Sequence, residues 1–459
     1  MTAPGGGGRS GQRGGPAAND GADRGADPHE HGGTVAPRTA ADPPAPAPPA
    51  PAPAPAPGLA RQPAPARGRA RARALGDDPT AWTTRAGNDP GAPGLPDGAL
   101  ARRLKARIAA RGPISVAEYM TEALGDPVYG YYTTRDPLGV AGDFTTAPEI
   151  SQMFGEIVGL WLADRAEAAG PTTQVVELGP GRGTLMVDAR RAAPSLADRT
   201  LWLIETSTTL RVAQDRRLPG ARWLDRLHAV PEAPMVLVGN EYLDVLPVRQ
   251  YLADGQAWRE VQIGIGAGGR LTFGLSGPLA VLAQRLGPPV PGAWAEISAV
   301  AEADIAEIAR RIAAFGGAAI LFDYGFVAAD RPSGPTLQAV QNHRPVAPLS
   351  CPGEADLTWL PDFDLLGAHA RASAAVDVHI TRQGAFLAEL GIGERAAALA
   401  AARPDEATAV ADALERLTLA EEMGALFKVM AIVPSGAARP PGFHPLSPVP
   451  ARAAAQGVR

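Results

Sequence analysis

Short apolar runs alternate with helix-like stretches through the middle of the chain, and this alternation constrains the fold more than any other feature. The runs are the segments QVVEL, LWLIE, MVLVG and AAILFDYG, at residues 174–178, 201–205, 235–239 and 318–325. Buried parallel strands have this continuous apolar composition, and the helices that connect them cover both faces of the sheet. The pattern therefore predicts the α/β class with a doubly wound, mostly parallel sheet. Ligands of such sheets bind beyond the carboxyl ends of the strands, so the residues just after each run are the candidate site residues.

Two further segments add strands to this pattern. From about residue 248 to 300 the sequence becomes hairpin-like around a GAGG turn at residues 266–269, which predicts a strand-rich insertion. The segment LFKVMAIVP, at residues 426–434, predicts a last strand near the C-terminus.

Helix-start signals come before the first strand. Asp97 is a candidate N-cap for the segment GALARRLKARIAAR, and Ser115 with Glu118 has the spacing of a capping box. Thr146 with Glu149 has the same spacing, and it precedes a segment whose apolar residues fall on one helical face. We expect a helix to begin at each of these three places.

The two ends of the chain have the composition of unstructured segments. Of the residues from Pro43 to Pro57, nine are proline and the rest are alanine, which favours a solvated polyproline II backbone. The expected segments are a disordered tail over 1–97, a helical N-terminal extension with a cofactor loop over 98–170, the α/β domain over 171–435 and a flexible C-terminal tail over 436–459.

Charge and cysteine content exclude several classes of protein. The chain has 43 Lys and Arg against 48 Asp and Glu, and its single cysteine, Cys351, excludes a disulfide framework and a cysteine-based zinc site. We expect no metal, because His369 and His379 lack ligand spacing with any acidic neighbour. We also expect no membrane span and no signal peptide, because no sufficiently long apolar run occurs. The N-terminal arginines Arg67, Arg69, Arg71 and Arg73 form either a solvated tail or a weak anchor for anionic surfaces. They do not make the basic folded domain that is typical of specific nucleic-acid binding.

The segment VVELGPGRGT puts Gly179, Gly181 and Gly183 in the turn between a strand and a helix. Glycines in such a turn let the backbone approach a ligand closely. A dinucleotide fingerprint needs glycines at the first, third and sixth positions of the turn, whereas the sixth position here is Thr184. The spacing therefore argues against NAD and leaves either another ligand or a tight strand-to-helix connection.

Two glutamates narrow the choice of ligand. Glu177 comes just before the turn and would repel a pyrophosphate, so it suits a cationic ligand. Glu205 ends the next strand, 26 residues after Gly179, where a carboxylate can accept hydrogen bonds from both hydroxyls of a ribose. An unmodified ribose beside a positive charge describes S-adenosylmethionine (AdoMet), which is the cofactor that we predict.

Several segments resemble a known family. ELGPGRG and IETS look like motif I of the class I methyltransferases and the segment that follows it. Four further segments, in one order along the chain, are similar to the MidA/NDUFAF7 family of AdoMet-dependent, protein arginine methyltransferases; they lie at residues 130–156, 240–251, 337–358 and 381–392. One departure is Tyr129, where the family's pattern leads us to expect a histidine.

The resemblance implies a class I methyltransferase fold, whose sheet ends in an antiparallel strand, for which residues 426–434 are the candidate. It also implies methylation of arginine on a partner protein, which in the mitochondrial members is a subunit of respiratory complex I. The location would be the cytoplasm for a bacterial-type chain and the mitochondrial matrix for a eukaryotic one. The motif GDFTTAPE suggests a loop, with Gly142, Phe144 and Thr145, that closes over the cofactor.

Polar residues after the MVLVG run are the candidate catalytic groups. Asn240, Glu241 and Asp244 follow that strand directly. An arginine guanidinium, with a pKa of about 12 or higher, is a poor nucleophile, but carboxylates can grip it in a fork and expose one nitrogen. Glu241 is the first candidate for this fork. The alternative for the cluster is a capped turn with a solvated charge.

Other polar residues keep two interpretations each. Asp323 and Tyr324 end a predicted strand, where they either line the ligand crevice or make a hydrogen bond at the sheet edge. His343 and Glu354 belong to a polar segment that forms either a lid or a surface loop.

Besides a protein arginine methyltransferase, two functions remain open on the sequence. One is a small-molecule methyltransferase, whose crevice would be too closed for a peptide. The other is a non-catalytic assembly factor that binds AdoMet only for stability. An NAD oxidoreductase is disfavoured by the spacing of the glycine turn.

Overall fold

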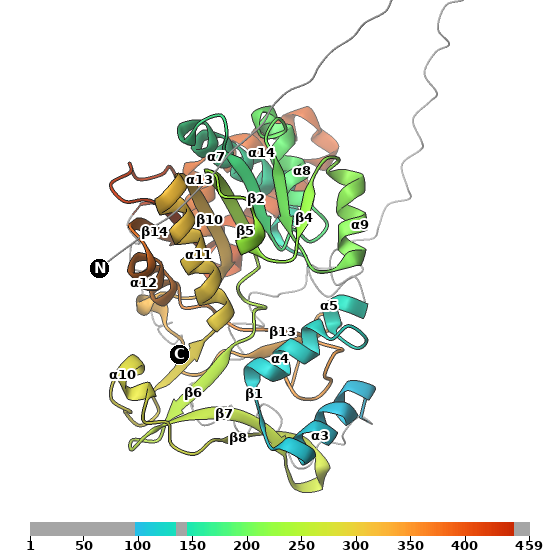
Figure 1. Cartoon of the computed structure of the whole chain (residues 1–459). Coiled ribbons are helices and arrows are strands. Elements are labelled where there is room, and N and C mark those ends of the chain that lie inside the picture. The colour runs from blue at the N-terminus through green and yellow to red at the C-terminus, as the bar shows by residue number, and fades with distance from the viewer. Residues whose placement is uncertain (1–96, 135–144, 445–459) are drawn as a thin grey trace, which may run out of the picture. The chain divides into compact units, whose positions relative to one another are not determined.

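The computed structural model describes residues 97–134 and 145–444 of the chain. Its main element is a seven-stranded sheet with the strand order β14-β15-β10-β5-β2-β3-β4 (Figure 1). The strands are β2 (Gln174–Leu178), β3 (Leu201–Ile204), β4 (Arg222–Leu224), β5 (Met235–Asn240), β10 (Gly317–Tyr324), β14 (Val376–Arg382) and β15 (Phe427–Pro434). Strands β10, β5, β2, β3 and β4 are parallel, while β15 runs antiparallel to both of its neighbours. The expected antiparallel strand at residues 426–434 is thus confirmed.

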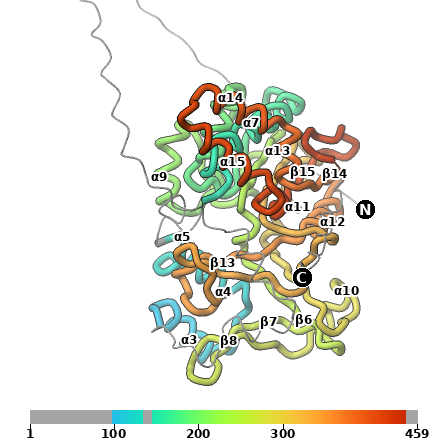
Figure 2. Tube along the Cα trace, turned by 180° about the vertical axis from the view of Figure 1, so that it is seen from behind, coloured from blue at the N-terminus to red at the C-terminus, as the bar shows by residue number. Residues whose placement is uncertain are grey.

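Helices cover both faces of this sheet, because successive residues of a strand point to opposite sides. Val175 and Val238 pack with the helices of one face, and Val176 and Leu237 pack with those of the other. The first face carries α7 (Gln152–Ala169), α8 (Thr184–Ala192), α13 (Gln383–Glu389), α14 (Ile392–Ala402) and α15 (Ala407–Thr418). The second face carries α11 (Ala299–Phe315) and α12 (Phe363–Ser373). The doubly wound sheet is confirmed, and Figure 2 shows the first layer from behind, where α14 contacts both α7 and α15.

Two glycines bring α7 and α8 into close contact. A Cβ atom added at Gly155 would lie 2.7 Å from the Cβ of Asp188, and one added at Gly159 would lie 2.4 Å from the Cα of Ala189. Any larger residue at these positions would force the two helices apart. Because α8 begins directly after the glycine turn, this packing also fixes the position of the turn.

The expected strand-rich insertion is present as an antiparallel sheet. It has the order β1-β7-β6-β9, with β8 paired to β7. Its elements are β1 (Ile114–Ser115), β6 (Arg249–Ala253), β7 (Trp258–Ile265), β8 (Leu271–Leu275), α10 (Leu282–Leu286) and β9 (Trp294–Ile297). The GAGG segment connects β7 to β8, as expected, while β1 is contributed by the N-terminal extension.

A third sheet lies in the polar segment for which a lid or a surface loop was expected. Its strands are β11 (Gln338–Gln341), β12 (Arg344–Val346) and β13 (Asp356–Thr358), in the order β12-β11-β13. Asn342 and His343 form the turn between β11 and β12, with φ values of 49° and 61°. Positive φ at both central residues is typical of a tight hairpin turn, so His343 belongs to a hairpin and not to a lid over a ligand.

The N-terminal extension consists of helices, as expected: α3 (Ala99–Arg111), α4 (Val116–Gly125) and α5 (Tyr131–Thr134). The capping box of Ser115 and Glu118 is confirmed at the start of α4. The expected N-cap at Asp97 is wrong, because Gly98 takes that position without a side-chain hydrogen bond. Asp97 instead binds the Nζ atom of Lys105, which draws its carboxylate away from the helix end.

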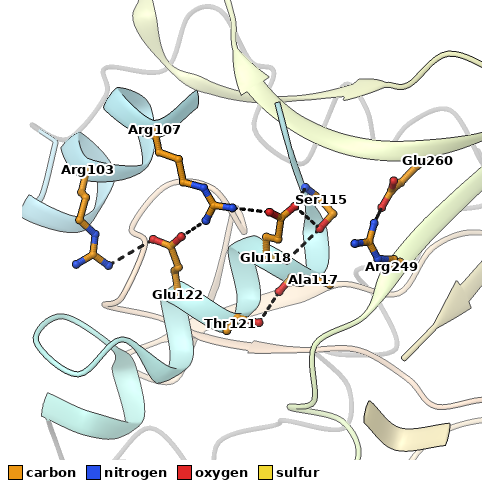
Figure 3. A network of polar contacts seen from close by, with 9 residues as sticks. All are labelled: Arg103, Arg107, Ser115, Ala117, Glu118, Thr121, Glu122, Arg249 and Glu260. Carbon is orange, nitrogen blue, oxygen red and sulfur yellow. Dashed lines mark hydrogen bonds and ion pairs between the residues drawn. The ribbon is translucent and has the colours of Figure 1, made fainter. Parts of the chain in front are cut away.

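Ion pairs join α3 to α4, as Figure 3 shows. Arg107 of α3 binds Glu118 and Glu122 of α4, and Arg103 binds Glu122 at 3.4 Å. Partly exposed pairs of this kind each contribute only about 0–1 kcal/mol, so their main effect is on the orientation of the two helices. The orientation of α4 is important because this helix also lines a cavity at the edge of the central sheet.

The expected capping box of Thr146 and Glu149 is also wrong. Thr146 is the N-cap of α6 (Ala147–Ile150) but makes no side-chain hydrogen bond to it. The long helix α7 begins separately, with Ser151 as the N-cap that accepts from the backbone N–H of Met153. The Glu149 carboxylate instead accepts a hydrogen bond from the Thr184 hydroxyl.

Residues 436–444, the first part of the flexible tail expected over 436–459, pack on the rest of the chain, and residues 445–459 lie outside the described residues. Phe443 is 2% exposed and packs on Phe386 with ring centroids 5.5 Å apart. The indole N–H of Trp161 also donates to the carbonyl of Pro441 at 3.2 Å. Residues 436–444 therefore pack on the helical layer, because they carry an aromatic anchor.

The described part of the chain contains no helix that is both long and apolar enough to cross a membrane. The N-terminal arginines Arg67, Arg69, Arg71 and Arg73 lie outside the described residues.

Candidate active site

A cavity of about 780 Å³ lies at the carboxyl ends of β2, β3 and β5. It is lined by the glycine turn, the ends of these strands, the segment around Glu149, helix α4 and strand β13. Most of the predicted site residues contribute to this one cavity; they are Glu177, Gly179, Gly181, Glu205, Asn240, Glu241 and Asp244. The topology brings them together because parallel strands end at the same edge of the sheet.

The glycine turn has a backbone that only glycine adopts easily. Gly179, Gly181 and Gly183 have φ values of +58°, +55° and +75°. A Cβ atom at Gly179 would lie 3.1 Å from the ring of Tyr242, and one at Gly183 would lie 2.9 Å from Leu218. Gly179 and Gly181 line the cavity, whereas Gly183 does not and forms the N-cap of α8. The role of Gly183 is therefore to shape the turn.

Glu177 is a buried carboxylate at the end of β2. It is 3% exposed, and burial raises its pKa from 4.5 to about 8. Its Oε2 atom has no hydrogen-bond partner within the described part of the chain, although the residue lines the cavity. A buried acceptor without a partner is costly unless a donor or a cation comes to it. Glu177 therefore marks a place where a positively charged ligand group would be favoured.

Glu205 follows β3 and faces the same cavity. Its Oε1 atom accepts from the backbone N–H of Ser207 at 2.7 Å, at the start of α9 (Thr208–Arg217), and its Oε2 atom accepts from Gln214 at 3.4 Å. Burial raises the pKa of Glu205. These bonds fix the carboxylate and leave further acceptor positions on both oxygens for ligand hydroxyls.

Gln214 is a site-supporting residue that the sequence analysis missed. It is fully buried, and its amide donates to the carbonyl of Gly181 at 2.7 Å as well as to Glu205. The indole N–H of Trp223 donates to the other end of the amide at 2.7 Å. Gln214 thus joins the glycine turn to Glu205, and nothing in its local sequence signals this.

The segment before α7 lies between the glycine turn and the end of β5. Glu149 accepts a hydrogen bond from Thr184, the first residue of α8, and the backbone N–H of Ala147 donates to Glu241 at 3.4 Å. Thr145, a predicted cofactor residue, does not line the cavity, whereas its neighbour Thr146 does. The other two predicted members of this loop, Gly142 and Phe144, lie outside the described residues.

The loop after β5 carries the predicted catalytic residues. Glu241 has a φ of +52°, which is strained for a residue with a side chain and costs about 1–3 kcal/mol. Its backbone N–H donates to the carbonyl of Phe322 at 2.9 Å, which holds this conformation. The amide of Asn240 donates to Glu241 at 3.4 Å, while the Asn240 Oδ1 atom is buried without a partner among the described residues. Strain of this kind persists where the surrounding structure enforces it, as at functional sites.

Asp323 supports this loop from beneath. It is fully buried, and its Oδ2 atom accepts from the backbone N–H groups of Leu243 and Asp244 at 2.7 and 3.1 Å. Burial raises the pKa of Asp323 well above its usual value, and so do the charges of Asp244 and Glu241. Neither Asp323 nor Tyr324 lines the cavity, and Tyr324 packs on Phe427. Asp323 therefore has the hydrogen-bonded, supporting position, and Tyr324 makes its ring contact away from the cavity.

Tyr132 and Asp356 also line the cavity and were not predicted as site residues. The Tyr132 hydroxyl donates to Asp356 Oδ1 at 2.8 Å. The only sequence signal was their position inside two of the segments that resemble the MidA/NDUFAF7 family. Glu354, two residues before Asp356, is exposed and does not line the cavity.

Most of the charged residues that line the cavity are acidic. Its charged residues are Glu149, Glu177, Glu205, Asp225, Glu241, Asp244 and Asp356 on the acidic side and Arg182 and Arg226 on the basic side. No group of three or more His, Cys, Asp or Glu side chains is arranged for a metal ion within residues 97–134 and 145–444. The acidic balance disfavours phosphate groups and favours cationic ligands.

These residues fit AdoMet. The glycine turn permits close approach of a ligand to the backbone, Glu177 offers an unpartnered acceptor for positive charge, and Glu205 offers acceptors for ribose hydroxyls. A pyrophosphate would meet Glu177 and Glu205 instead of the donors that it requires. When bound, AdoMet supplies an electrophilic methyl group.

Comparisons with known proteins agree with this fit. Residues 157–381 match a family described as putative S-adenosyl-L-methionine-dependent methyltransferase. The mitochondrial protein arginine methyltransferase NDUFAF7 homolog of Drosophila melanogaster is 35% identical, over 73% of this chain and 85% of the relative. The NDUFAF7 of Homo sapiens, also mitochondrial, is 34% identical, over 73% of this chain and 83% of the relative.

A solved structure of similar fold comes from Burkholderia thailandensis. It is a likely methyl transferase bound to S-adenosyl-homocysteine, with 29% identity and a TM-score of 0.65, over 77% of this chain and 97% of that chain. The extent and identity of these matches show the family. The present chain belongs to the NDUFAF7 family of S-adenosyl-L-methionine-dependent methyltransferases.

Proposed function

We propose that this protein transfers the methyl group of AdoMet to arginine side chains of a partner protein. The observation that carries the proposal is that Glu241 and Asp244 line the same cavity as the glycine turn. Seven acidic residues against two basic ones favour a cationic acceptor over a carboxylate or a phosphate. The names of the relatives, which describe protein arginine methyltransferases, support the same substrate.

In this proposal the β2–β3 side of the cavity holds the cofactor. Gly179 and Gly181 allow close approach of the backbone, Gly183 shapes the turn, Glu177 attracts the positive charge and Glu205 accepts from the ribose. Gly142, Phe144 and Thr145 remain proposed members of a covering loop. Methyl transfer is an in-line displacement, so the task of the protein is to hold both partners on one axis.

The β5 side of the cavity would hold the guanidinium. Glu241 and Asp244 accept from its N–H groups in a fork, and the Asn240 amide oxygen offers one more acceptor. The strained backbone at Glu241 and the support from Asp323 keep the carboxylates in place. A guanidinium that gains a methyl group must lose a proton, and a carboxylate oxygen of Glu241 is the acceptor that we propose for it.

The target that we would test first is a respiratory complex I subunit, because the resemblance to the MidA/NDUFAF7 family implies one. The proposed location is the cytoplasm for a bacterial chain and the mitochondrial matrix for a eukaryotic one.

The test adds tritiated AdoMet to lysate from a strain that lacks this protein, with wild-type protein or with Glu241→Gln. We expect one or more labelled proteins with the wild type only, and methylarginine after acid hydrolysis. Label in small molecules alone would favour a small-molecule methyltransferase. Tight AdoMet binding with no label in any fraction would favour the non-catalytic assembly factor.

A further inference from the structure

We propose that Asp356 is a third substrate-binding carboxylate, which together with Glu241 and Asp244 selects a guanidinium over a neutral side chain of the same shape. The inference rests on the proposed function and adds a residue from a different sheet to the substrate site.

Strand β13 presents alternate residues to two environments. Asp356 and Thr358 line the cavity, while Leu357 between them is buried in a separate apolar cluster with residues such as Leu104 and Tyr119. This is the expected alternation of a strand with one face on a core and one on a ligand space. Asp356 is therefore directed to the cavity by the register of β13, which pairs it with Val340 of β11.

Hydrogen bonds fasten β13 to the loop that carries Asp244. The backbone N–H of Trp359 donates to the carbonyl of Asp244 at 3.0 Å, and its indole N–H donates to the carbonyl of Leu246 at 3.0 Å. Both bonds therefore connect the end of β13 to the segment that follows β5. Asp356 and Asp244 thus lie on connected parts of one cavity wall.

Tyr132 interacts with both carboxylates, by a hydrogen bond to Asp356 and through the negative charge of Asp244. Its hydroxyl donates to Asp356 Oδ1 at 2.8 Å. Burial raises the pKa of Tyr132 well above its usual value, and the charges of Asp356 and Asp244 raise it further. The phenol therefore stays neutral and acts as a donor that fixes the orientation of Asp356.

A surface of several fixed carboxylates suits the planar guanidinium, which has five N–H donors. A neutral side chain of the same shape would leave part of this negative charge uncompensated. Glu177 provides independent support for a ligand in this cavity, since it is 3% exposed and its Oε2 atom has no partner among the described residues.

The test compares wild-type protein with Asp356→Asn, Tyr132→Phe and Glu354→Gln. Glu354→Gln is the matched control, because it removes the same charge two residues away at an exposed position outside the cavity. The probes are a short glycine-flanked arginine peptide and the same peptide with citrulline, which is a neutral isostere of arginine. Calorimetry measures both peptides with S-adenosylhomocysteine present, and also measures AdoMet alone.

We expect the wild type and Glu354→Gln to prefer arginine over citrulline equally. Asp356→Asn should reduce this preference by roughly tenfold or more, with AdoMet affinity within about twofold of wild type. Tyr132→Phe keeps the charge and should reduce the preference less. If Asp356→Asn fails to fold, Asp356→Glu keeps the charge and should retain the preference for arginine.

Equal weakening of both peptides by Asp356→Asn would overturn the inference, because it would mean that Asp356 only supports the wall. Loss of the preference for arginine over citrulline in Asp356→Glu would also overturn the inference. A wild type that prefers arginine yet labels no arginine would instead contradict the proposed function, since binding selectivity and methyl transfer are measured separately.

Discussion

The Asp323 carboxylate accepts a hydrogen bond from the backbone N–H of Asp244 at 3.1 Å, and through it the end of β10 holds the loop after β5. The same oxygen accepts from Leu243 at 2.7 Å. Since Asp323 is fully buried and does not line the cavity, its contribution to activity passes through the loop alone.

We expect Asp323→Ala to lower kcat for methyl transfer by about 10–100-fold, because misplacement of reacting groups by about an ångström has an effect of this size. AdoMet affinity should change little. Asp323→Asn should retain most of the activity, because burial raises the pKa of Asp323 and an amide resembles the neutral carboxyl. Steady-state kinetics measures kcat and calorimetry measures AdoMet affinity for both variants. An equal loss of kcat in Asp323→Ala and Asp323→Asn would contradict the role of Asp323 as a hydrogen-bond acceptor for the loop.

The contact between α7 and α8 makes a prediction about stability. Gly159→Ala should lower the free energy of unfolding by about 1–3 kcal/mol, since its Cβ would lie 2.4 Å from the Cα of Ala189. Gly393→Ala in α14 is the control, because a Cβ there meets nothing within 4 Å and should stabilise the helix by about 0.5–1 kcal/mol. Urea denaturation measures both. A neutral Gly159→Ala would mean that the two helices separate without cost.

The central sheet could be predicted because its strands are buried on both faces. Every residue of β2 is buried, and an apolar run is the direct consequence. Strand β14 was missed because most of it is only half-buried and its sequence, VDVHITR, mixes polar and apolar residues. Local composition therefore reports the centre of the sheet better than its edge.

The residues that line the cavity beside β2 and β3 were predictable for a different reason. Glu177 lies in a recognisable strand, Gly179 directly follows that strand, and Glu205 follows the next one. Tyr132 and Asp356 were missed because they are 224 residues apart and meet only where helix α5 and strand β13 come together in the fold. The capping box of Glu149 was wrong for the same reason, since its partner Thr184 is 35 residues away.

The raised pKa of Glu177, about 8, predicts a proton release on cofactor binding. Because this folded-state pKa lies above the unfolded value, the stabilising effect of the bound proton is complete below about pH 4.5 and is lost as the pH rises to about 8. A cationic ligand favours the ionised form, so AdoMet binding at pH 7 should release a proton from Glu177. Calorimetry in phosphate and in Tris buffer should therefore give different apparent enthalpies.

The control for this prediction is Glu177→Gln, in which the difference between the buffers should shrink or vanish. An identical buffer dependence in the variant and the wild type would assign the proton to another group.

Glu205→Ala should weaken AdoMet binding by roughly tenfold to a thousandfold, equivalent to about 2–4 kcal/mol, because two charge-assisted hydrogen bonds are lost. S-adenosylhomocysteine should compete with AdoMet, and NAD should not bind. Direct titration of the three ligands tests this. An unchanged AdoMet affinity would show that the ribose lies elsewhere in the cavity.

Glu241→Gln separates the substrate side of the cavity from the cofactor side. The amide keeps the size and one acceptor but loses the charge, so methyl transfer should fall by at least about a hundredfold, equivalent to roughly 2.7 kcal/mol. AdoMet affinity should hardly change, whereas the same substitution at Glu177 or Glu205 should weaken AdoMet first. Single-turnover transfer of tritiated methyl groups, measured beside AdoMet titrations, gives both quantities. Full transfer by Glu241→Gln would move the proton-accepting role to Asp244, which lies in the same loop and lines the same cavity.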